Sequence, residues 1–329
     1  MININKIFEN NQLIMKLYSL YISEYNRSID EVRVKCLAKD LQIDDDYAFY
    51  LLFINFLGFD IVDNKDHLNL ANQYIRPYLK SLDVEEYKNN PYYINIVPKS
   101  KKLGKWTLKY QTYKPYELFV CNDLIIDNYY EYPNIGYFKK QFKYLTVLEN
   151  NHEWMLITPN EIETMKEPIN KAYGNVITFG LGLGYFAYMV SLKDNVESIT
   201  IVEKDKEVID LFTSEILPFF EHKSKIKIIN ADAFDIMKQG INNYDYCFID
   251  IWHDASDGVP LYVKFKQLEK FNNLVKIDYW VETTLVSYIK WYLYSNFEEL
   301  KELNKLSSDV EIKDILNNEY INKILVEKN

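Results

Sequence analysis

The sequence has little cysteine and little histidine, and both are scattered. Its three cysteines, Cys36, Cys121 and Cys247, lie far apart, no Cys-x-x-Cys pair occurs, and the chain holds only four histidines. A structural zinc site needs clustered thiolates or imidazoles, and a disulfide framework needs paired cysteines in a small secreted chain. We therefore expect reduced, buried thiols, no metal site and a cytoplasmic protein.

Long hydrophobic runs are also absent. The most apolar stretch, residues 47–59, is well short of the roughly 20 residues that a membrane-spanning helix needs. No apolar segment with a small-residue cleavage site follows Lys6, so the sequence predicts neither a signal peptide nor a membrane span.

An excess of positive charge is the third absence. The net charge is −10, whereas a nucleic-acid binder needs a positive surface that displaces counterions from phosphates. We therefore expect no nucleic-acid and no membrane partner. A small-molecule substrate is expected instead, and a cationic one is the easiest to reconcile with this charge. Hydrophobic residues make up 48% of the chain, which is enough to bury a core.

The first of three predicted regions, residues 1–90, reads as a helical domain. Helices are expected at 29–41 and 47–57, the second capped by the acids at 44–46. Residues 60–70 read as a short hairpin. Helix, turn, helix and hairpin is the order of a winged helix, so a winged-helix-like domain is predicted.

The remaining chain divides into a β-rich segment and an α/β domain. Residues 91–170 begin with a proline-containing linker and continue as short strands, with Asn150-Asn151 favouring a hairpin turn. Residues 171–329 alternate strand and helix to about residue 251, and beyond about residue 261 they read mainly as helices. This alternation predicts a Rossmann-like fold, a doubly wound parallel sheet with helices on both faces.

Three glycines alternate at the first strand-to-helix turn of the α/β domain. Gly180, Gly182 and Gly184 follow the expected strand 175–179 and precede the expected helix 185–193. Glycine permits positive φ and lets a ligand approach the backbone closely. A turn of this kind is typical of nucleotide binding.

Acidic residues follow at the ends of the next three expected strands. Glu203 comes about 20 residues after the glycine turn, where a carboxylate can accept hydrogen bonds from both ribose hydroxyls. Asp232 can accept from an adenine amino group while the Ala233 N–H serves a ring nitrogen. Asp250 ends the fourth strand and faces the crevice at the carboxyl ends of the sheet. Four features at successive strand ends indicate a nucleoside site.

These motifs together resemble those of class I S-adenosylmethionine-dependent methyltransferases. The glycine turn is followed by Tyr185-Phe186, the second strand reads I-T-I-V-E-K-D, and the third is followed by N-A-D-A-F-D. The resemblance implies the class I methyltransferase fold and S-adenosyl-L-methionine as cofactor. It implies cofactor contacts from Gly180, Leu181, Gly182, Gly184, Glu203, Lys204, Asp232, Ala233 and Asp250.

Within that superfamily the chain is most similar to the spermidine-synthase branch. Those proteins also place a β segment directly before the core, carry an I/V-V-E-x-D motif, and have a fourth-strand aspartate that assists amine deprotonation, matched by Asp250. Their acidic, methionine-containing segment before the core is matched by Glu161, Glu163 and Met165. Glu163 is therefore expected at the methionine end of the cofactor.

The chain departs from both patterns at several positions. Leu183 stands where the synthases have an acid that holds the substrate end of the cofactor, and Thr178 stands where methyltransferases carry an acid. The synthase D-x-x-D-P signature becomes Asp250-Ile-Trp-His253-Asp254, and no N-P-P-Y motif follows the fourth strand. These departures leave the transferred group and the acceptor open.

Residues 250–257 form the candidate catalytic stretch. Asp250 or His253 is the expected general base, and histidine has a suitable pKa near neutrality. Trp252 is a candidate for stacking on adenine or on a cationic substrate, with Asp254 and Asp257 as further substrate-binding candidates. The ordinary alternatives are a solvent-exposed histidine and a core tryptophan.

The expected activity is methyl transfer from S-adenosylmethionine to a small molecule. Aminopropyl transfer to a polyamine and a non-catalytic nucleoside-binding scaffold or sensor remain alternatives. The first region resembles the N-terminal winged-helix domain of small-molecule O-methyltransferases, which commonly dimerises and covers the active site, so a homodimer is one expectation.

Overall fold

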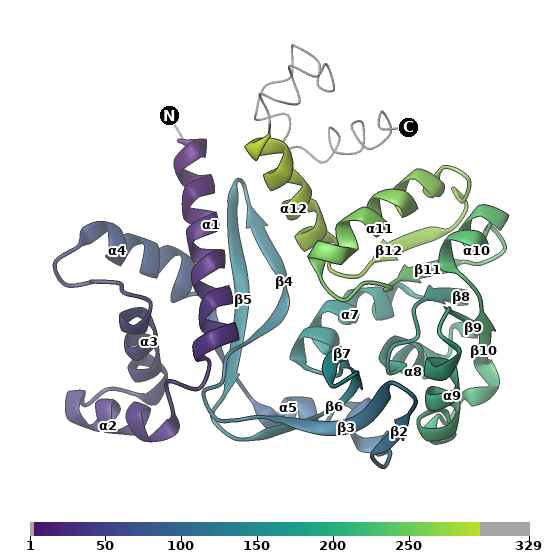
Figure 1. Ribbon diagram of the computed structural model, residues 1–329, viewed down its shortest axis with the longest axis horizontal. Helices are drawn as coiled ribbons and strands as arrows, with labels where there is room; N and C mark the ends of the chain where they lie inside the picture. Colours follow the sequence, from purple (N-terminus) through teal and green to yellow (C-terminus); the bar gives the residue numbers. More distant parts are fainter. Residues whose placement is uncertain (1–2, 297–329) are drawn as a thin grey trace, which may run out of the picture. The chain divides into compact units, whose positions relative to one another are not determined.

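A computed structural model describes residues 3–296 of the chain, which form two compact units (Figure 1). Within the described residues, unit 1 comprises residues 3–90, 110–145 and 158–163, and unit 2 comprises residues 91–109, 146–157 and 164–296. The predicted helical C-terminus beyond residue 296 lies outside the described residues. No helix in the described part of the chain is long and apolar enough to cross a membrane.

Unit 1 consists of a group of helices and a three-stranded sheet. The helices are α1 (Ile4–Leu20), which continues into the π-helical turn η1 (Tyr21–Tyr25), α2 (Glu31–Leu41), α3 (Asp45–Phe56), α4 (Lys65–Leu70), the π-helical turn η2 (Ala71–Ile75) and α5 (Val84–Lys88). The strands are β1 (Leu79–Leu82), β4 (Phe119–Asp127) and β5 (Tyr130–Phe138), in the order β1-β5-β4.

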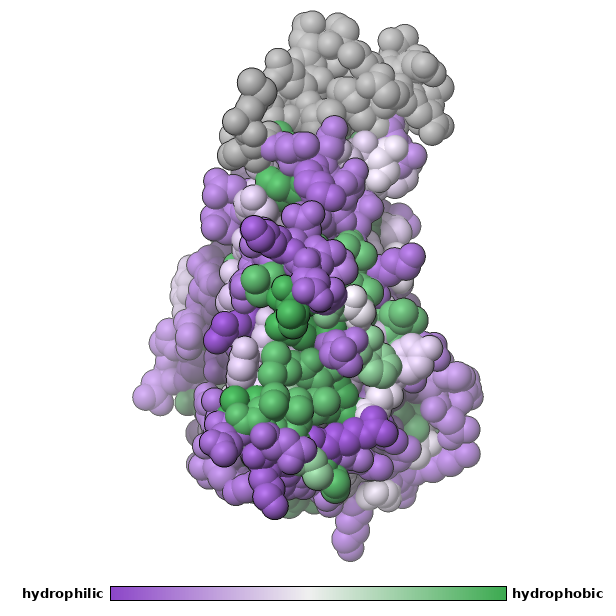
Figure 2. Space-filling view, turned by 90° about the vertical axis from the view of Figure 1, so that its left-hand side faces the viewer, coloured by the Kyte–Doolittle hydropathy of each residue, from purple (hydrophilic) through white to green (hydrophobic). Residues whose placement is uncertain are grey.

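Helices α2 and α3 confirm the two helices expected from the sequence. Each begins at an aspartate whose carboxylate accepts a backbone N–H, Asp30 from Arg33 and Asp44 from Tyr47. Helix α3 is apolar on all sides, so burying Phe49 and Phe53 in the core leaves Phe56 41% exposed. Figure 2 shows hydrophobic surface gathered over α3.

The hairpin expected at residues 60–70 is wrong, and with it the wing of the winged helix. The Asn64 side chain accepts hydrogen bonds from the N–H groups of Asp66 and His67 and so starts helix α4 instead of a hairpin turn. The Asp60 N–H donates to Nδ1 of His67, 3.0 Å away, which ties the preceding loop to this helix. The helical part of the prediction is confirmed.

Strand β5 was hidden from sequence reading by two residues that disfavour strands. Pro133 has no N–H to donate, and the register between β4 and β5 is irregular between Asn122 and Ile125, opposite this proline. At Gly136 a Cβ would lie 2.8 Å from the Leu82 side chain and 2.9 Å from that of Phe119, so this central strand needs glycine for close packing.

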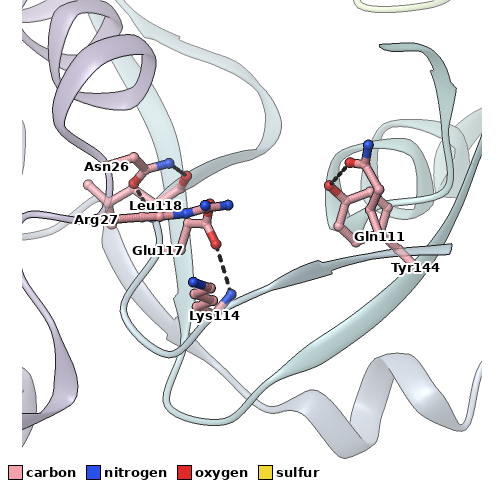
Figure 3. A network of polar contacts seen from close by, with 7 residues as sticks. All are labelled: Asn26, Arg27, Gln111, Lys114, Glu117, Leu118 and Tyr144. Atoms are coloured by element: carbon pink, nitrogen blue, oxygen red, sulfur yellow. Dashed lines mark hydrogen bonds and ion pairs between the residues drawn. The ribbon is translucent and has the colours of Figure 1, made fainter. Parts of the chain in front are cut away.

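A polar network joins the end of α1 and η1 to the turn before β4 (Figure 3). The Asn26 side chain accepts from the Leu118 N–H at 2.6 Å and donates to the Leu118 carbonyl at 2.7 Å. Beside it, Arg27 pairs with Glu117 at 3.2 Å, and Glu117 also accepts the Lys114 N–H. One amide thus satisfies both backbone groups of a residue distant in sequence.

We predict that Asn26→Ala destabilises the protein by about 1–3 kcal/mol, because the N–H and the carbonyl of the buried residue Leu118 lose their partner. Arg27→Ala is the matched control, since the Arg27 side chain is 65% exposed and Glu117 keeps the Lys114 N–H as a partner, so we expect a loss of less than about 1 kcal/mol. Urea unfolding of both full-length variants measures the difference. Equal losses would mean that the Asn26 amide is not the stabilising contact.

Unit 2 is built on a five-stranded parallel sheet, which confirms the predicted Rossmann-like α/β architecture in outline. Its strands are β8 (Gly174–Phe179), β9 (Val196–Glu203), β10 (Ile226–Asn230), β11 (Tyr246–Ile249) and β12 (Lys276–Tyr279). The spatial order is β10-β9-β8-β11-β12, and every pair is parallel. This is the doubly wound order, in which the direction of strand addition reverses at β8.

Helices alternate with these strands along the chain, as expected. They are α8 (Tyr185–Ser191), α9 (Lys206–Glu215), α10 (Ala233–Gln239), α11 (Ala255–Glu269) and α12 (Glu282–Ser295), with short 3₁₀ turns η3 (Leu217–Phe219) and η4 (Lys223–Lys225). Strand β12 was not expected, because four residues between two helices give too short a pattern to recognise.

The segment before the core carries the predicted β structure. Its elements are α6 (Pro91–Asn95), β2 (Lys101–Leu103), β3 (Trp106–Tyr113), β6 (Phe142–Glu149), β7 (His152–Leu156) and α7 (Pro159–Lys171), with a sheet order of β2-β3-β6-β7. The predicted hairpin turn is confirmed, because Asn150 and Asn151 have φ of 50° and 71° and connect paired strands. Residues 101–103, expected in a linker, form a strand instead.

Candidate functional site

The glycine turn after β8 has two packed glycines and one open glycine. A Cβ at Gly180 would lie 1.8 Å from the backbone oxygen of Asp250, and one at Gly184 would lie 2.4 Å from the Phe212 ring. A Cβ at Gly182 would meet nothing within 4 Å. All three have positive φ, between 52° and 94°. Gly182 therefore leaves space beside the backbone that the chain itself does not fill.

Glu203, at the carboxyl end of β9, is directed at this turn by backbone hydrogen bonds. Its Oε2 accepts the Leu181 N–H at 3.3 Å, and its Oε1 accepts the Asp205 N–H at 2.8 Å. Burial raises the pKa of Glu203 above its usual range, and these backbone donors oppose that shift. Each oxygen keeps a lone pair for a further donor such as a ribose hydroxyl.

The residues after β9 and β10 are held by the chain's own hydrogen bonds. Asp232 is the N-cap of α10, with Oδ1 accepting the Phe234 N–H at 2.8 Å, and its side chain is exposed. Ala233 is buried, and Lys204 is exposed with its carbonyl accepting from the Asn230 amide. Helix capping alone is enough to explain an aspartate at position 232. The cap uses only Oδ1 of this carboxylate, so Oδ2 is not needed for it.

Asp250 follows β11, and its N–H bonds the carbonyl of Phe179 at 2.9 Å. The carboxyl lies deep among the atoms of this sheet edge, although part of its surface still reaches solvent. Burial raises the pKa of Asp250 to about 7. A carboxyl whose pKa is raised toward neutrality is suited to accept a proton from a reacting group.

The stretch after Asp250 divides into a cap and an aromatic pair. Asp254 accepts the Ser256 N–H, and Asp257 accepts the N–H groups of His253 and Asp254, which together form a capping box for α11. Both carboxylates are thereby explained as helix caps. Their predicted role in substrate binding stays a prediction.

Trp252 is buried, at 5% exposure, and its Nε1 has no hydrogen-bond partner. Its ring stacks on that of Tyr279 at 6.3 Å and 16°. His253 is more open, with 40% of its side chain exposed and Nδ1 lying 3.6 Å from an oxygen of Asp254. The structure therefore places Trp252 in the wall of the sheet edge and His253 at its surface.

The remaining predicted residues are distributed over both units. Glu163 belongs to unit 1, where it accepts the hydroxyl of Tyr87 at 3.2 Å. Leu183 is buried in unit 2 at 2% exposure, and its carbonyl accepts the hydroxyl of Tyr92 at 2.6 Å. Thr178 is buried in β8. A buried leucine offers no charge for an ammonium group.

Sequence reasoning did not anticipate Trp154, which stacks on His253 with ring centroids 5.5 Å apart and 25° between planes. Its only local signal is an aromatic residue directly after the predicted hairpin turn. No group of three or more His, Cys, Asp and Glu side chains that could hold a metal occurs among residues 3–296.

Comparisons with known proteins identify no family for this chain and only distant structural similarity. No protein-family model and no curated protein matches the chain. Among solved structures, a spermidine synthase from Thermotoga maritima is 18% identical with a TM-score of 0.28 over 40% of this chain. A spermidine synthase in complex with the transition-state analogue AdoDATO is 19% identical with a TM-score of 0.30 over the same share.

The matched region spans 45% and 47% of those two proteins, less than half of each. Similarity at this level does not carry an activity over to this chain. Any functional conclusion depends on the residues at the carboxyl edge of the parallel sheet.

We predict that Asp250 makes the protein less stable as the pH rises. Its folded pKa of about 7 lies above the unfolded value of about 3.9, so between these values the folded state holds a proton that the unfolded state has lost. The unfolding free energy should therefore fall by roughly 1–4 kcal/mol between pH 4 and pH 7 through this group alone.

Asp250→Asn cannot ionise and should lack this fall, which urea unfolding at pH 4.5 and pH 7.5 measures. Asp235→Asn, on an exposed residue of α10, is the control and should follow the wild type. The same pH dependence in all three proteins would contradict the raised pKa.

Proposed function

We propose that unit 2 binds S-adenosyl-L-methionine and that the chain is a transferase that passes its methyl group to a small-molecule acceptor. The observation that carries the proposal is the Glu203 carboxylate, held at the end of β9 by the Leu181 N–H of the glycine turn. A carboxylate in this place is suited to the two hydroxyls of a ribose.

The open side of Gly182 supports the same ligand. Gly180 and Gly184 are required by packing, whereas Gly182 faces space in which a Cβ would meet no atom. Ligands of open α/β sheets bind outside the carboxyl ends of the strands, at the point where strand order reverses. Gly182 and Glu203 both lie at that edge, and Asp232 follows the neighbouring strand.

The spacing of the glycines favours this nucleoside over a dinucleotide. Dinucleotide folds use G-x-G-x-x-G, with a pyrophosphate at the helix N-terminus. Here the third glycine comes one residue earlier, and the first turn of α8 is occupied by Tyr185 and Phe186, both buried. Because these two bulky side chains pack at the N-terminus of α8, this position is less suited to a pyrophosphate.

When bound, S-adenosylmethionine supplies a methyl carbon attached to a positively charged sulfur. The residues of this chain then need to align the acceptor and to take its proton. Alignment alone contributes much of the acceleration of such a transfer. Asp250, with its pKa of about 7, is suited to take the proton, and His253 beside Asp254 is the second candidate.

Aminopropyl transfer uses the same sheet edge and is the alternative enzyme function. In this reaction, too, Asp250 would act as the general base and take a proton from the amine. The buried, apolar Leu183 counts against it, because the synthase pattern has an acid at this position. A nucleoside-binding scaffold or sensor without turnover is the non-enzymatic alternative.

Calorimetric titration with S-adenosylmethionine, S-adenosylhomocysteine and decarboxylated S-adenosylmethionine tests the proposal. We expect the first two to bind more tightly than the decarboxylated form. Preference for the decarboxylated form would favour aminopropyl transfer, and no binding of any of the three would refute the proposal. Tight binding without methyl transfer to any acceptor would favour the scaffold function.

We further predict that Glu203→Gln weakens S-adenosylmethionine binding by more than about 1 kcal/mol, because hydrogen bonds from the ribose to a charged acceptor are lost. This corresponds to a loss in affinity of at least about fivefold. Glu207→Gln, an exposed carboxylate in the first turn of α9, is the control and should bind as the wild type does. Unchanged affinity in Glu203→Gln would show that this carboxylate does not contact the ribose.

A further inference from the structure

Residues 91–109 and 146–157, which we call the cover, contact three loops at the carboxyl edge of the parallel sheet within unit 2. The Tyr92 hydroxyl donates to the Leu183 carbonyl in the loop after β8. The Lys105 ammonium lies 3.4 Å from Asp205 in the loop after β9. The third contact is the stacking of Trp154 on His253, in the loop after β11. A ligand at this edge would therefore face the cover as well as the strand ends.

Three rings form a row between the cover and the loop after β11. Trp106 and Trp154 meet at 6.2 Å with 61° between their planes, and Trp154 stacks on His253. Trp106, at one end of the row, is 2% exposed, whereas Trp154, in the middle, remains 42% exposed. Trp154 is thus fixed by two aromatic neighbours while much of its surface stays open.

The charges around the row leave Trp154 without a cation of its own. The Lys105 ammonium lies 4.8 Å from the centre of the Trp106 ring and also pairs with Glu149 and Asp205. Among residues 3–296, no lysine or arginine occupies the corresponding place over Trp154. The face of an indole ring is electronegative and attracts a cation within about 6 Å of its centre.

We propose that Trp154 offers its open surface to the sulfonium of S-adenosylmethionine and makes the site prefer the charged sulfur to the neutral thioether of the product. This rests on the proposed function. The loop that carries His253 follows β11, which lies next to β8 where the strand order reverses. A ligand with its ribose at Glu203, after β9, and its chain along the glycine turn, after β8, would extend toward the loop after β11, the next strand in the sheet.

The preference has a clear benefit for a transferase. A cation on an aromatic face loses that attraction when its charge is lost, so the spent thioether binds less tightly than the reactant. The apolar area that the two ligands bury is almost the same. If a change at Trp154 weakens binding of the sulfonium more than binding of the thioether, the ring recognises the charge. If it weakens binding of both ligands equally, the ring contributes only shape.

The experiment is calorimetric titration of the wild type, Trp154→Phe and Trp154→Leu with S-adenosylmethionine and with S-adenosylhomocysteine. We expect Trp154→Leu to weaken binding of the sulfonium by about three- to thirtyfold, with Phe in between, and binding of the thioether by less than about twofold. Tyr173→Leu is the control, since it removes an exposed aromatic residue just before β8, at the opposite edge of the same sheet.

Equal loss of both ligands, or no loss of either, would overturn the proposal. If the wild type binds neither ligand, it is the proposed function that fails. Difluorotryptophan incorporated at position 154 should preserve the fold and the shape of the side chain, but its fluorine atoms make the face of the ring less negative. It should lower the affinity for the sulfonium alone, and unchanged affinity would overturn the proposal even if the Leu variant does not fold.

Discussion

In a parallel sheet every strand ends at the same edge, and this constraint brings together all the residues that matter here. The glycine turn follows β8, Glu203 ends β9, and Asp250 follows β11, so residues far apart in sequence become neighbours. The packing is tight enough to fix one loop against the next. Gly180 lies so close to the Asp250 carbonyl that no side chain fits between them. The glycine turn therefore cannot move without displacing the candidate base.

Local signals explain why much of unit 2 could be predicted. The strands from β8 to β11 and their helices follow from the alternation of apolar and polar segments, and β8 and α8 begin within one residue of their expected starts. The acids at strand ends follow from the same spacing. Local signals also explain the errors: Asn64 looks like a turn residue, but its side chain caps a helix, which a pattern of residue types does not distinguish.

Contacts between distant segments could not be predicted in this way. Even the local capping of α11 by Asp254 and Asp257 was not predicted, and their expected role in substrate binding stays a prediction. Trp154 was not recognised as a site residue, because its partner His253 is about a hundred residues away. Spacing along the chain predicts which loops meet, but side-chain packing between segments decides which groups in those loops remain available.

Burial and charge act on the same atoms at this edge. Burial of Asp250 raises its pKa to about 7, because an isolated charge is poorly solvated there. Under the proposed function, the arriving sulfonium is an opposite charge beside this carboxyl, and an opposite charge lowers the pKa of an acid. Cofactor binding would then favour the ionised form of Asp250, so that the base becomes available when the electrophile is in place. The Trp154 ring, by contrast, is 42% exposed, so water screens part of its attraction for a cation. Burial at this sheet edge would thus serve the removal of the acceptor's proton, while the open ring of Trp154 would serve the recognition of the charged cofactor.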